Sequence, residues 1–206
     1  MSQTLTPAAP QDLNARRHRL RRYRAVIFDM DGVITDTAGV HAQAWKELFD
    51  GALPAVGALP ANAAVVAADP DVLRPFDAAA DYLHHVDGRP REDGVRTFFA
   101  SRGLHVPEAD SPEADAAPEL TVLALAERKQ GYFEQVLERD GVRVFPEAQD
   151  LLERLRAKGV PVALVTSSKN SRAVLTAGGV LDFFPVIVDG NTAVERGLPG
   201  KPDPAM

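Results

Sequence analysis

An uninterrupted apolar stretch at residues 25–28 runs directly into two acids, Asp29 and Asp31. A short apolar run of this kind is typical of a buried strand in a parallel sheet rather than of an amphipathic helix. Residues 161–165 and 185–188 have the same character. The sequence therefore predicts three parallel strands, the first of which ends in a pair of carboxylates.

Helical patterns lie between the second and third of these strands and before the second. Residues 146–158 place their apolar side chains on one helical face and stop at Gly159, and residues 171–177 form a shorter pattern followed by Gly178. This alternation predicts an α/β fold, a Rossmann-like parallel sheet with right-handed crossovers. In such sheets ligands bind at the carboxyl ends of the strands, which is where the two acids fall.

The segment between the first strand and the helix at residue 146 is too long for a simple crossover and shows little strand character. We therefore expect a core formed by residues 25–37 and 141–206, interrupted by a helical cap at residues 38–140. The Ala- and Pro-rich segment 51–70 has few side chains able to anchor it, and we expect a loop or a weakly helical linker there. The helical patterns within the cap cover residues 40–49, 76–86, 94–102 and 121–138.

The charge balance argues against a protein built to coat nucleic acid, because the net charge is -6 and the pI is near 5.4. The one basic cluster, residues 15–24, lies in an N-terminal tail at 1–24; a solvated helix or arm explains it more simply than an acidic partner does. The chain has no cysteine, no apolar leader and no run approaching the roughly 18 apolar residues that a membrane span needs. We expect a cytoplasmic location, and the sequence makes no prediction of oligomeric state.

Three polar motifs follow predicted core elements in order. Asp29 and Asp31, two apart on an extended chain, face the same way and can bind Mg²⁺, attack phosphorus or carry a proton; a helix-capping turn is the simpler alternative. Residues 166–170, Thr-Ser-Ser-Lys-Asn, suit either phosphate oxygens or an N-cap. Lys201 suits a phosphate and a carboxylate, or the surface. The order of the three favours the functional interpretation.

At these residues the chain resembles the haloacid dehalogenase superfamily over residues 25–206. FDMDGVITDT matches the family's first motif, Thr166 the hydroxyl of the second and Lys201 the lysine of the third. Four further stretches, TDTAGVHAQAWK, DGRPREDGVR, AERKQ and TSSKN, are similar to the β-phosphoglucomutase-like branch.

The resemblance implies phosphoryl transfer on a small sugar phosphate. Asp29 would attack phosphorus to form an aspartyl phosphate, and Asp31 would serve as general acid and base. Mg²⁺ would be held by the Asp29 carboxylate and the Asp31 backbone carbonyl. Lys201 would balance the charge at Asp29. The remaining core residues implied to hold phosphate oxygens are Thr166, Ser168, Lys169 and Asn170.

The resemblance also assigns cap residues to the substrate. Arg91 would grip its distal phosphate, since a guanidinium binds phosphate in bidentate fashion. His41 and Trp45 share a helical face and would close over the sugar, or else pack core against cap. Lys129 and Gln130 match a substrate-facing position; a solvated helix face is the alternative for both.

The implied reaction is that of a Mg²⁺-dependent mutase converting β-glucose 1-phosphate to glucose 6-phosphate, with a sugar-phosphate phosphatase as the alternative. The sequence departs from the family in one respect: the acidic pair of the fourth motif is absent, because the chain stops at Met206. By the resemblance this pair completes the Mg²⁺ site, so we expect the remaining metal ligands beyond Met206. We expect a C-terminally truncated chain that lacks the last core strands and leaves apolar residues of the first strand, such as Ile27, uncovered. A second hypothesis is that the chain as given is a catalytically incomplete phosphate-binding fragment.

Overall fold

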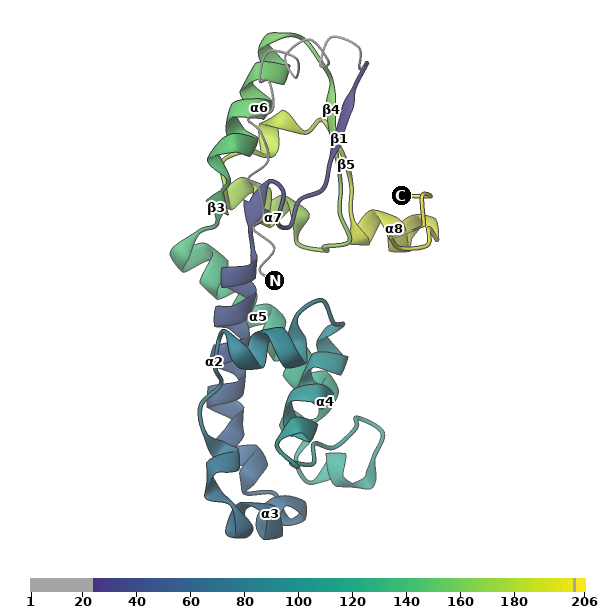
Figure 1. Cartoon of the computed structure of the whole chain (residues 1–206). Helices are drawn as coiled ribbons and strands as arrows, with labels where there is room; N and C mark the ends of the chain where they lie inside the picture. The colour runs from purple at the N-terminus through teal and green to yellow at the C-terminus, as the bar shows by residue number, and fades with distance from the viewer. Residues whose placement is uncertain (1–23, 202) are drawn as a thin grey trace, which may run out of the picture.

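The computed structural model describes residues 24–201 and 203–206; apart from Arg24, the predicted basic tail lies outside the described residues. The molecule is elongated, with a sheet at one end and a helical unit at the other (Figure 1). The strands are β1 (Val26–Phe28), β2 (Thr35–Asp36), β3 (Arg143–Val144), β4 (Val162–Val165) and β5 (Val186–Val188). The α-helices are α2 (Ala38–Gly57), α3 (Ala63–Ala68), α4 (Arg91–Ser101), α5 (Val122–Asp140), α6 (Pro146–Ala157), α7 (Ser171–Ala177) and α8 (Gly190–Arg196). Short helical turns are η2 (Pro60–Asn62), η3 (Pro70–Leu73), η4 (Tyr82–Val86), η5 (Pro112–Asp115), η6 (Pro118–Leu120) and η7 (Leu181–Phe183).

The three predicted strands form one parallel sheet in the order β1-β4-β5, which confirms the α/β prediction. Phe28 lies opposite Leu164, and both pack against the apolar faces of α6 and α7. The expectation that the first strand is fully buried is wrong. Ile27, which was expected to be uncovered, is 68% exposed and Val186 is 55% exposed. Among the described residues the opposite face of the sheet is therefore open, and β1 forms one edge of the sheet.

The core helices begin and end where the sequence predicts. Helix α6 starts with Pro146, whose fixed φ suits a first helical turn, and the chain reverses at Gly159 in the left-handed conformation. Leu152 and Leu155 on its inner face are completely buried. Helix α7 matches the predicted span of residues 171–177.

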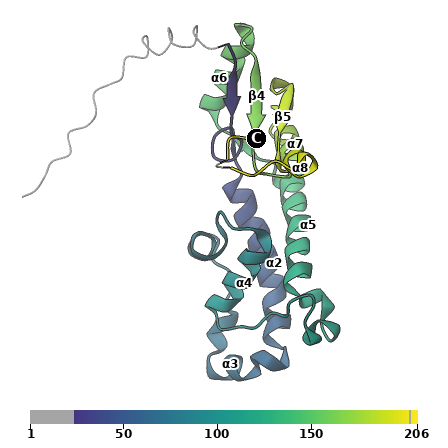
Figure 2. The same ribbon diagram turned by 90° about the vertical axis from the view of Figure 1, so that its right-hand side faces the viewer.

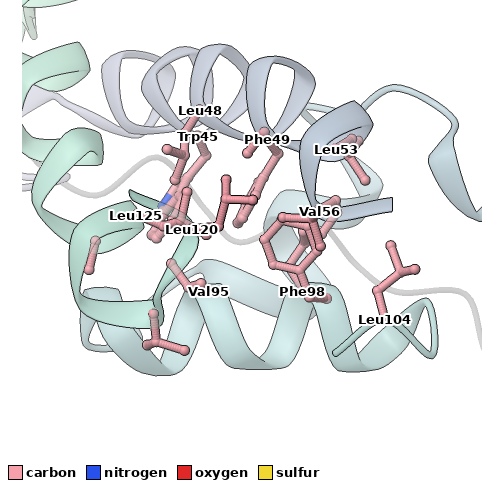
Figure 3. Packing of buried hydrophobic residues seen from close by; sticks show 14 of the residues in the cluster. Trp45, Leu48, Phe49, Leu53, Val56, Val95, Phe98, Leu104, Leu120 and Leu125 are labelled. Carbon is pink, nitrogen blue, oxygen red and sulfur yellow. The ribbon is translucent and has the colours of Figure 1, made fainter. Parts of the chain in front are cut away.

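The cap has its own apolar core, formed mainly by α2, α4 and α5 (Figure 3). Phe49 and Phe98 stack at its centre with their ring centroids 3.8 Å apart. The residues labelled in Figure 3 are Trp45, Leu48, Phe49, Leu53, Val56, Val95, Phe98, Leu104, Leu120 and Leu125. Burial of these large side chains supplies the main stabilising free energy of the cap.

Two cap predictions are wrong. For the segment 51–70 the loop is wrong and the helical alternative is right, but the segment is anchored: α2 continues to Gly57, with Leu53 and Val56 buried in the cap core, and η2 and α3 follow. Residues 76–86 do not form one regular helix either: residues 76–79 are not helical, and residues 82–86 form the π-helical turn η4.

The cap joins the core through a two-stranded antiparallel ladder, β2 with β3. Arg143 Nη2 donates to Asp36 Oδ2 at 2.6 Å across this ladder. Helices α2 and α5 run side by side from the cap toward the sheet (Figures 1 and 2). Among the described residues no single helix is long and apolar enough to cross a membrane. Helix α2 and the helical segment 60–68 together have the required length and composition, but they are bent by 84° with respect to each other.

Candidate active site

Asp29 lies just beyond the end of β1, and its two carboxylate oxygens have different surroundings. Lys201 Nζ donates to Oδ1 at 2.9 Å, and the backbone N–H of Met30 donates to the same oxygen at 2.8 Å. The side chain of Asp29 is 44% exposed. The third motif thus meets the first in space, although their residues are far apart in the sequence.

Asp31 is held by hydroxyl groups on both of its carboxylate oxygens. Thr37 Oγ1 donates to Oδ1 at 2.6 Å, and Thr166 Oγ1 donates to Oδ2 at 3.3 Å. Both threonines are buried, so the orientation of the Asp31 carboxylate is fixed from two elements. The sequence did not predict this contact of Thr37; its only signal is a hydroxyl six positions after the acid.

The loop that follows β4 is shaped by its own polar groups. The backbone N–H of Ser168 donates to Thr166 Oγ1, and that of Asn170 donates to Ser168 Oγ, each at 3.1 Å. Gly190 packs against this loop so closely that a Cβ would lie 2.5 Å from Ser167 O. A larger residue there would displace the loop.

Asp189, after β5, anchors the same region and was not identified from the sequence. Ser171 Oγ donates to Asp189 Oδ2 at 2.6 Å, and Thr192 binds Oδ1. Burial alone would raise the pKa of Asp189, but the hydrogen bonds from Ser171 and Thr192 lower it below its usual value. The available signal was an acid directly after an apolar run, as at Asp29.

A cavity of about 680 Å³ separates cap and core and gathers most of the predicted residues. Asp29, Thr166 and Lys201 do not line it; Asp29 and Lys201 pair with each other, and Thr166 contacts Asp31. The lining includes Tyr82, Asp87 and Arg89, which sequence reasoning did not single out. The predicted residues in its wall are Asp31, His41, Trp45, Arg91, Lys129, Gln130, Ser168, Lys169 and Asn170.

Lys129 is buried in the cap wall of this cavity, so the solvated-face alternative is wrong for it. Its Nζ lies 2.8 Å from His41 Nδ1 and 5.2 Å from the centre of the Trp45 ring. Burial, then the nearby Arg91, lowers the pKa of Lys129 to about 7. Burial, then Lys129 and Arg91, lowers the pKa of His41 to about 3. His41 is therefore neutral, and its Nδ1 accepts from Lys129 when the ammonium is charged.

His41 and Trp45 both line the cavity and pack within the protein, so the packing alternative is confirmed and their closure over a sugar stays a prediction. The His41 ring stacks on Phe133 with centroids 4.5 Å apart, and the Trp45 ring stacks on Phe49 at 5.0 Å.

The oxygen atoms at the first motif are of the type that Mg²⁺ binds, but they are fewer than the ion needs. A carboxylate oxygen of Asp29 and the backbone carbonyl of Asp31 are hard oxygen ligands, whereas Mg²⁺ takes about six in octahedral geometry. Within residues 24–201 and 203–206 no group of three or more His, Cys, Asp or Glu side chains is arranged to hold a metal. Water and phosphate oxygens would have to supply many of the other positions.

Comparison with known proteins decides the family. The model for haloacid dehalogenase-like hydrolases matches residues 23–206. The chain belongs to this family. The match covers the whole sheet and the cap, and the resemblance seen in the motifs is confirmed.

Relatives within the family are similar to this chain over most of its length. A β-phosphoglucomutase of Mycobacterium bovis is 43% identical over 183 residues, which are 89% of this chain and 66% of the relative. A phosphoglycolate phosphatase of Yersinia pseudotuberculosis is 27% identical, covering 91% of this chain and 66% of the relative. The chain thus spans just under two thirds of the length of these curated relatives.

A solved structure shows the same fold. The structure described as a putative β-phosphoglucomutase from Thermotoga maritima superposes with a TM-score of 0.57 at 22% identity, covering 87% of this chain and 65% of that one. At this identity the likeness establishes the arrangement of sheet and helices.

Proposed function

We propose that the protein is a Mg²⁺-dependent phosphoryl-transfer enzyme that converts β-glucose 1-phosphate to glucose 6-phosphate through an aspartyl phosphate. The observation that carries this proposal is the presence of two separate cationic positions, one at the proposed nucleophile and one in the cavity wall. Lys201 pairs with Asp29 on the core, outside the cavity lining, whereas Lys129 and Arg91 line the cavity from the cap. A mutase needs both, because its bisphosphate intermediate carries one phosphate at each end.

Asp29 is the proposed nucleophile. Its Oδ1 accepts from Lys201 and from the backbone of Met30, which leaves Oδ2 as the oxygen that attacks phosphorus. The new bond joins Oδ2 to phosphorus, and the bond from phosphorus to the sugar oxygen breaks. Lys201 offsets the negative charge that gathers on the transferring group.

Asp31 is the proposed proton carrier. When Asp29 takes a phosphoryl group from the bisphosphate, Asp31 gives a proton to the sugar oxygen that leaves phosphorus. In the return step it removes the proton from the free hydroxyl of a sugar monophosphate, whose oxygen attacks the phosphorus on Asp29 as the bond from phosphorus to Asp29 Oδ2 breaks. The hydroxyls of Thr37 and Thr166 hold its carboxylate in one orientation. Such fixed geometry accelerates transfer because little reorganisation remains.

Mg²⁺ is proposed as the cofactor, from the family resemblance and the chemistry of the ligands. The Asp29 carboxylate and the Asp31 carbonyl would hold it, and when bound it would neutralise charge on the phosphoryl oxygens.

The proposal is tested by supplying the protein with β-glucose 1-phosphate, Mg²⁺ and a trace of glucose 1,6-bisphosphate, and following the products by ³¹P NMR. We expect glucose 6-phosphate to appear at the rate at which the substrate disappears. Inorganic phosphate appearing at a comparable rate, with no isomer formed, would overturn the mutase.

A phosphatase is the second candidate. It is favoured by the exposure of the Asp29 side chain, which water can approach, and by the phosphoglycolate phosphatase among the relatives. The same assay separates the two by the ratio of isomer to inorganic phosphate. Applied to the 206-residue chain alone, phosphate binding without turnover would support the third candidate, an incomplete binding fragment.

A further inference from the structure

Gln130 lies on α5 where the cap meets the core, and its amide joins two groups that come from opposite sides of the cavity. Arg91 Nη1, from the cap, donates to Gln130 Oε1 at 3.1 Å. Asn170, from the core loop after β4, forms a reciprocal pair with the same amide: Gln130 Nε2 donates to Asn170 Oδ1 at 2.7 Å, and Asn170 Nδ2 donates to Gln130 Oε1 at 3.3 Å.

These contacts leave the donors of both partners available for an anion. A guanidinium has five N–H donors, and Gln130 takes one of them. Among the described residues no carboxylate forms an ion pair with Arg91. The Asn170 side chain likewise keeps one amide N–H beyond its pair with Gln130. Arg91, Gln130 and Asn170 all line the cavity.

We propose that Gln130 is a positioning residue that sets Arg91 of the cap and Asn170 of the core onto the same phosphate group of the substrate. This inference rests on the proposed function and adds to it, because the family resemblance gives Gln130 only a substrate-facing position. The amide acts through its two partners. Its contacts fix a long, flexible arginine before the substrate arrives, so that less conformational freedom is lost on binding.

If Gln130 has this role, its loss should affect only substrates with a second phosphate that reaches Arg91 and Asn170. Glucose 1,6-bisphosphate presents a second phosphate to Arg91 and Asn170, whereas acetyl phosphate can deliver its one phosphoryl group to Asp29 without them. Gln130→Ala should therefore raise KM for the bisphosphate about 10- to 100-fold, the scale of a hydrogen bond to a charged group. The kcat, and hydrolysis of acetyl phosphate, should change less than about threefold.

Two further variants make the test specific. Gln130→Glu keeps an acceptor for Arg91 but has no donor for Asn170 Oδ1, and it should also raise KM. Glu134→Ala is the matched control on the same helix: it removes an exposed acceptor of Gln130 Nε2, at 2.8 Å, and should leave KM unchanged. Melting temperatures close to that of the wild type verify folding.

A direct role is distinguished from positioning in an Arg91→Ala, Asn170→Ala background. There, Gln130→Ala should have no further effect on binding of the bisphosphate by calorimetry; a full effect would mean that Gln130 binds the substrate itself and would overturn the inference. An unchanged KM in Gln130→Ala would overturn it too. If the wild type forms no isomer, the proposed function fails, while the calorimetric comparison still reports on Gln130.

Discussion

The Asp29 side chain is exposed, and only one of its carboxylate oxygens accepts hydrogen bonds from the described residues. This suits a nucleophile better than a structural carboxylate. A structural role would show both oxygens in hydrogen bonds and little exposure, as at Asp189, which is 6% exposed and bound through both oxygens. At Asp29 only Oδ1 has partners among the described residues, and the side chain is 44% exposed. This difference supports the proposed role of Asp29 as the nucleophile and a structural role for Asp189.

Asp29→Asn should abolish turnover while leaving the protein folded. The amide keeps the size of the side chain but cannot attack phosphorus, so kcat should fall roughly 10⁴-fold or more, the scale of losing a nucleophile. Initial rates with β-glucose 1-phosphate measure the loss, and an unchanged melting temperature serves as the control. A variant that retained more than a few per cent of the activity would refute the aspartyl-phosphate mechanism.

Lys129 should destabilise the fold in a pH-dependent manner. Its pKa is 10.5 when unfolded and about 7 when folded, so between these values the unfolded chain binds more protons and stability rises with pH. Below pH 7 the full cost of the buried ammonium is present. Lys129→Met should therefore raise the free energy of unfolding more at pH 7 than at pH 10, by on the order of 3 kcal/mol.

Urea unfolding of wild type and Lys129→Met at the two pH values measures this difference. Lys158→Met, at an exposed lysine, is the control and should show no such difference. A gain from Lys129→Met that is the same at both pH values would contradict the assignment. The same variant should also bind the bisphosphate more weakly, because the proposed function uses the Lys129 ammonium as a cation for a substrate phosphate. The burial of this ammonium then costs stability but serves binding.

Among the elements, α2 shows most directly how tertiary packing overrides local composition. Its last two turns hold Gly51, Pro54 and Gly57, and glycine and proline disfavour a stable isolated helix. They remain helical because Leu53 and Val56 fill the cap core beside Phe98. Phe98 belongs to α4, which is distant from α2 in the sequence, so the local sequence pattern of residues 51–57 does not predict this packing.

Leu53→Ala tests this packing. Leu53 is 2% exposed, and truncation should lower the free energy of unfolding by about 2–5 kcal/mol, the range for a buried leucine. Leu83→Ala, on the cap but 67% exposed, is the matched control and should change stability by less than about 0.5 kcal/mol. Denaturant unfolding gives both values. Equal effects would mean that residues 51–57 do not belong to the cap core.

The sequence anticipates elements whose signals are local and misses contacts that depend on distant partners. The strands at β1, β4 and β5 and the span of α7 follow from apolar runs and from glycines after them. The proximity of Lys201 and Asp29 was implied by the family resemblance and is seen at 2.9 Å. The contact of Thr37 with Asp31 depends on a tight turn at Gly32, whose φ of 73° no spacing rule provides.

At the scale of the whole molecule, two apolar clusters are joined by the same two helices. The start of α2, including Val40, and the later part of α5, including Phe133, pack in the sheet cluster, whereas Trp45 and Leu125 of these helices pack in the cap cluster. Tyr132 packs against both clusters. Movement of the cap relative to the sheet must therefore act on α2 and α5 as well as on the β2–β3 ladder.

The open face of the sheet should make the 206-residue chain self-associate. Ile27, Ala163 and Val186 lie in register across β1, β4 and β5, and the two larger side chains are 68% and 55% exposed. Contiguous exposed apolar residues favour association, all the more beside β1, which is an edge strand among the described residues. Val186→Lys should lower light scattering as concentration rises, whereas Leu83→Lys, which charges an isolated exposed leucine on the cap, should not. Scattering that Val186→Lys leaves unchanged would show that this row of side chains is not the site of association.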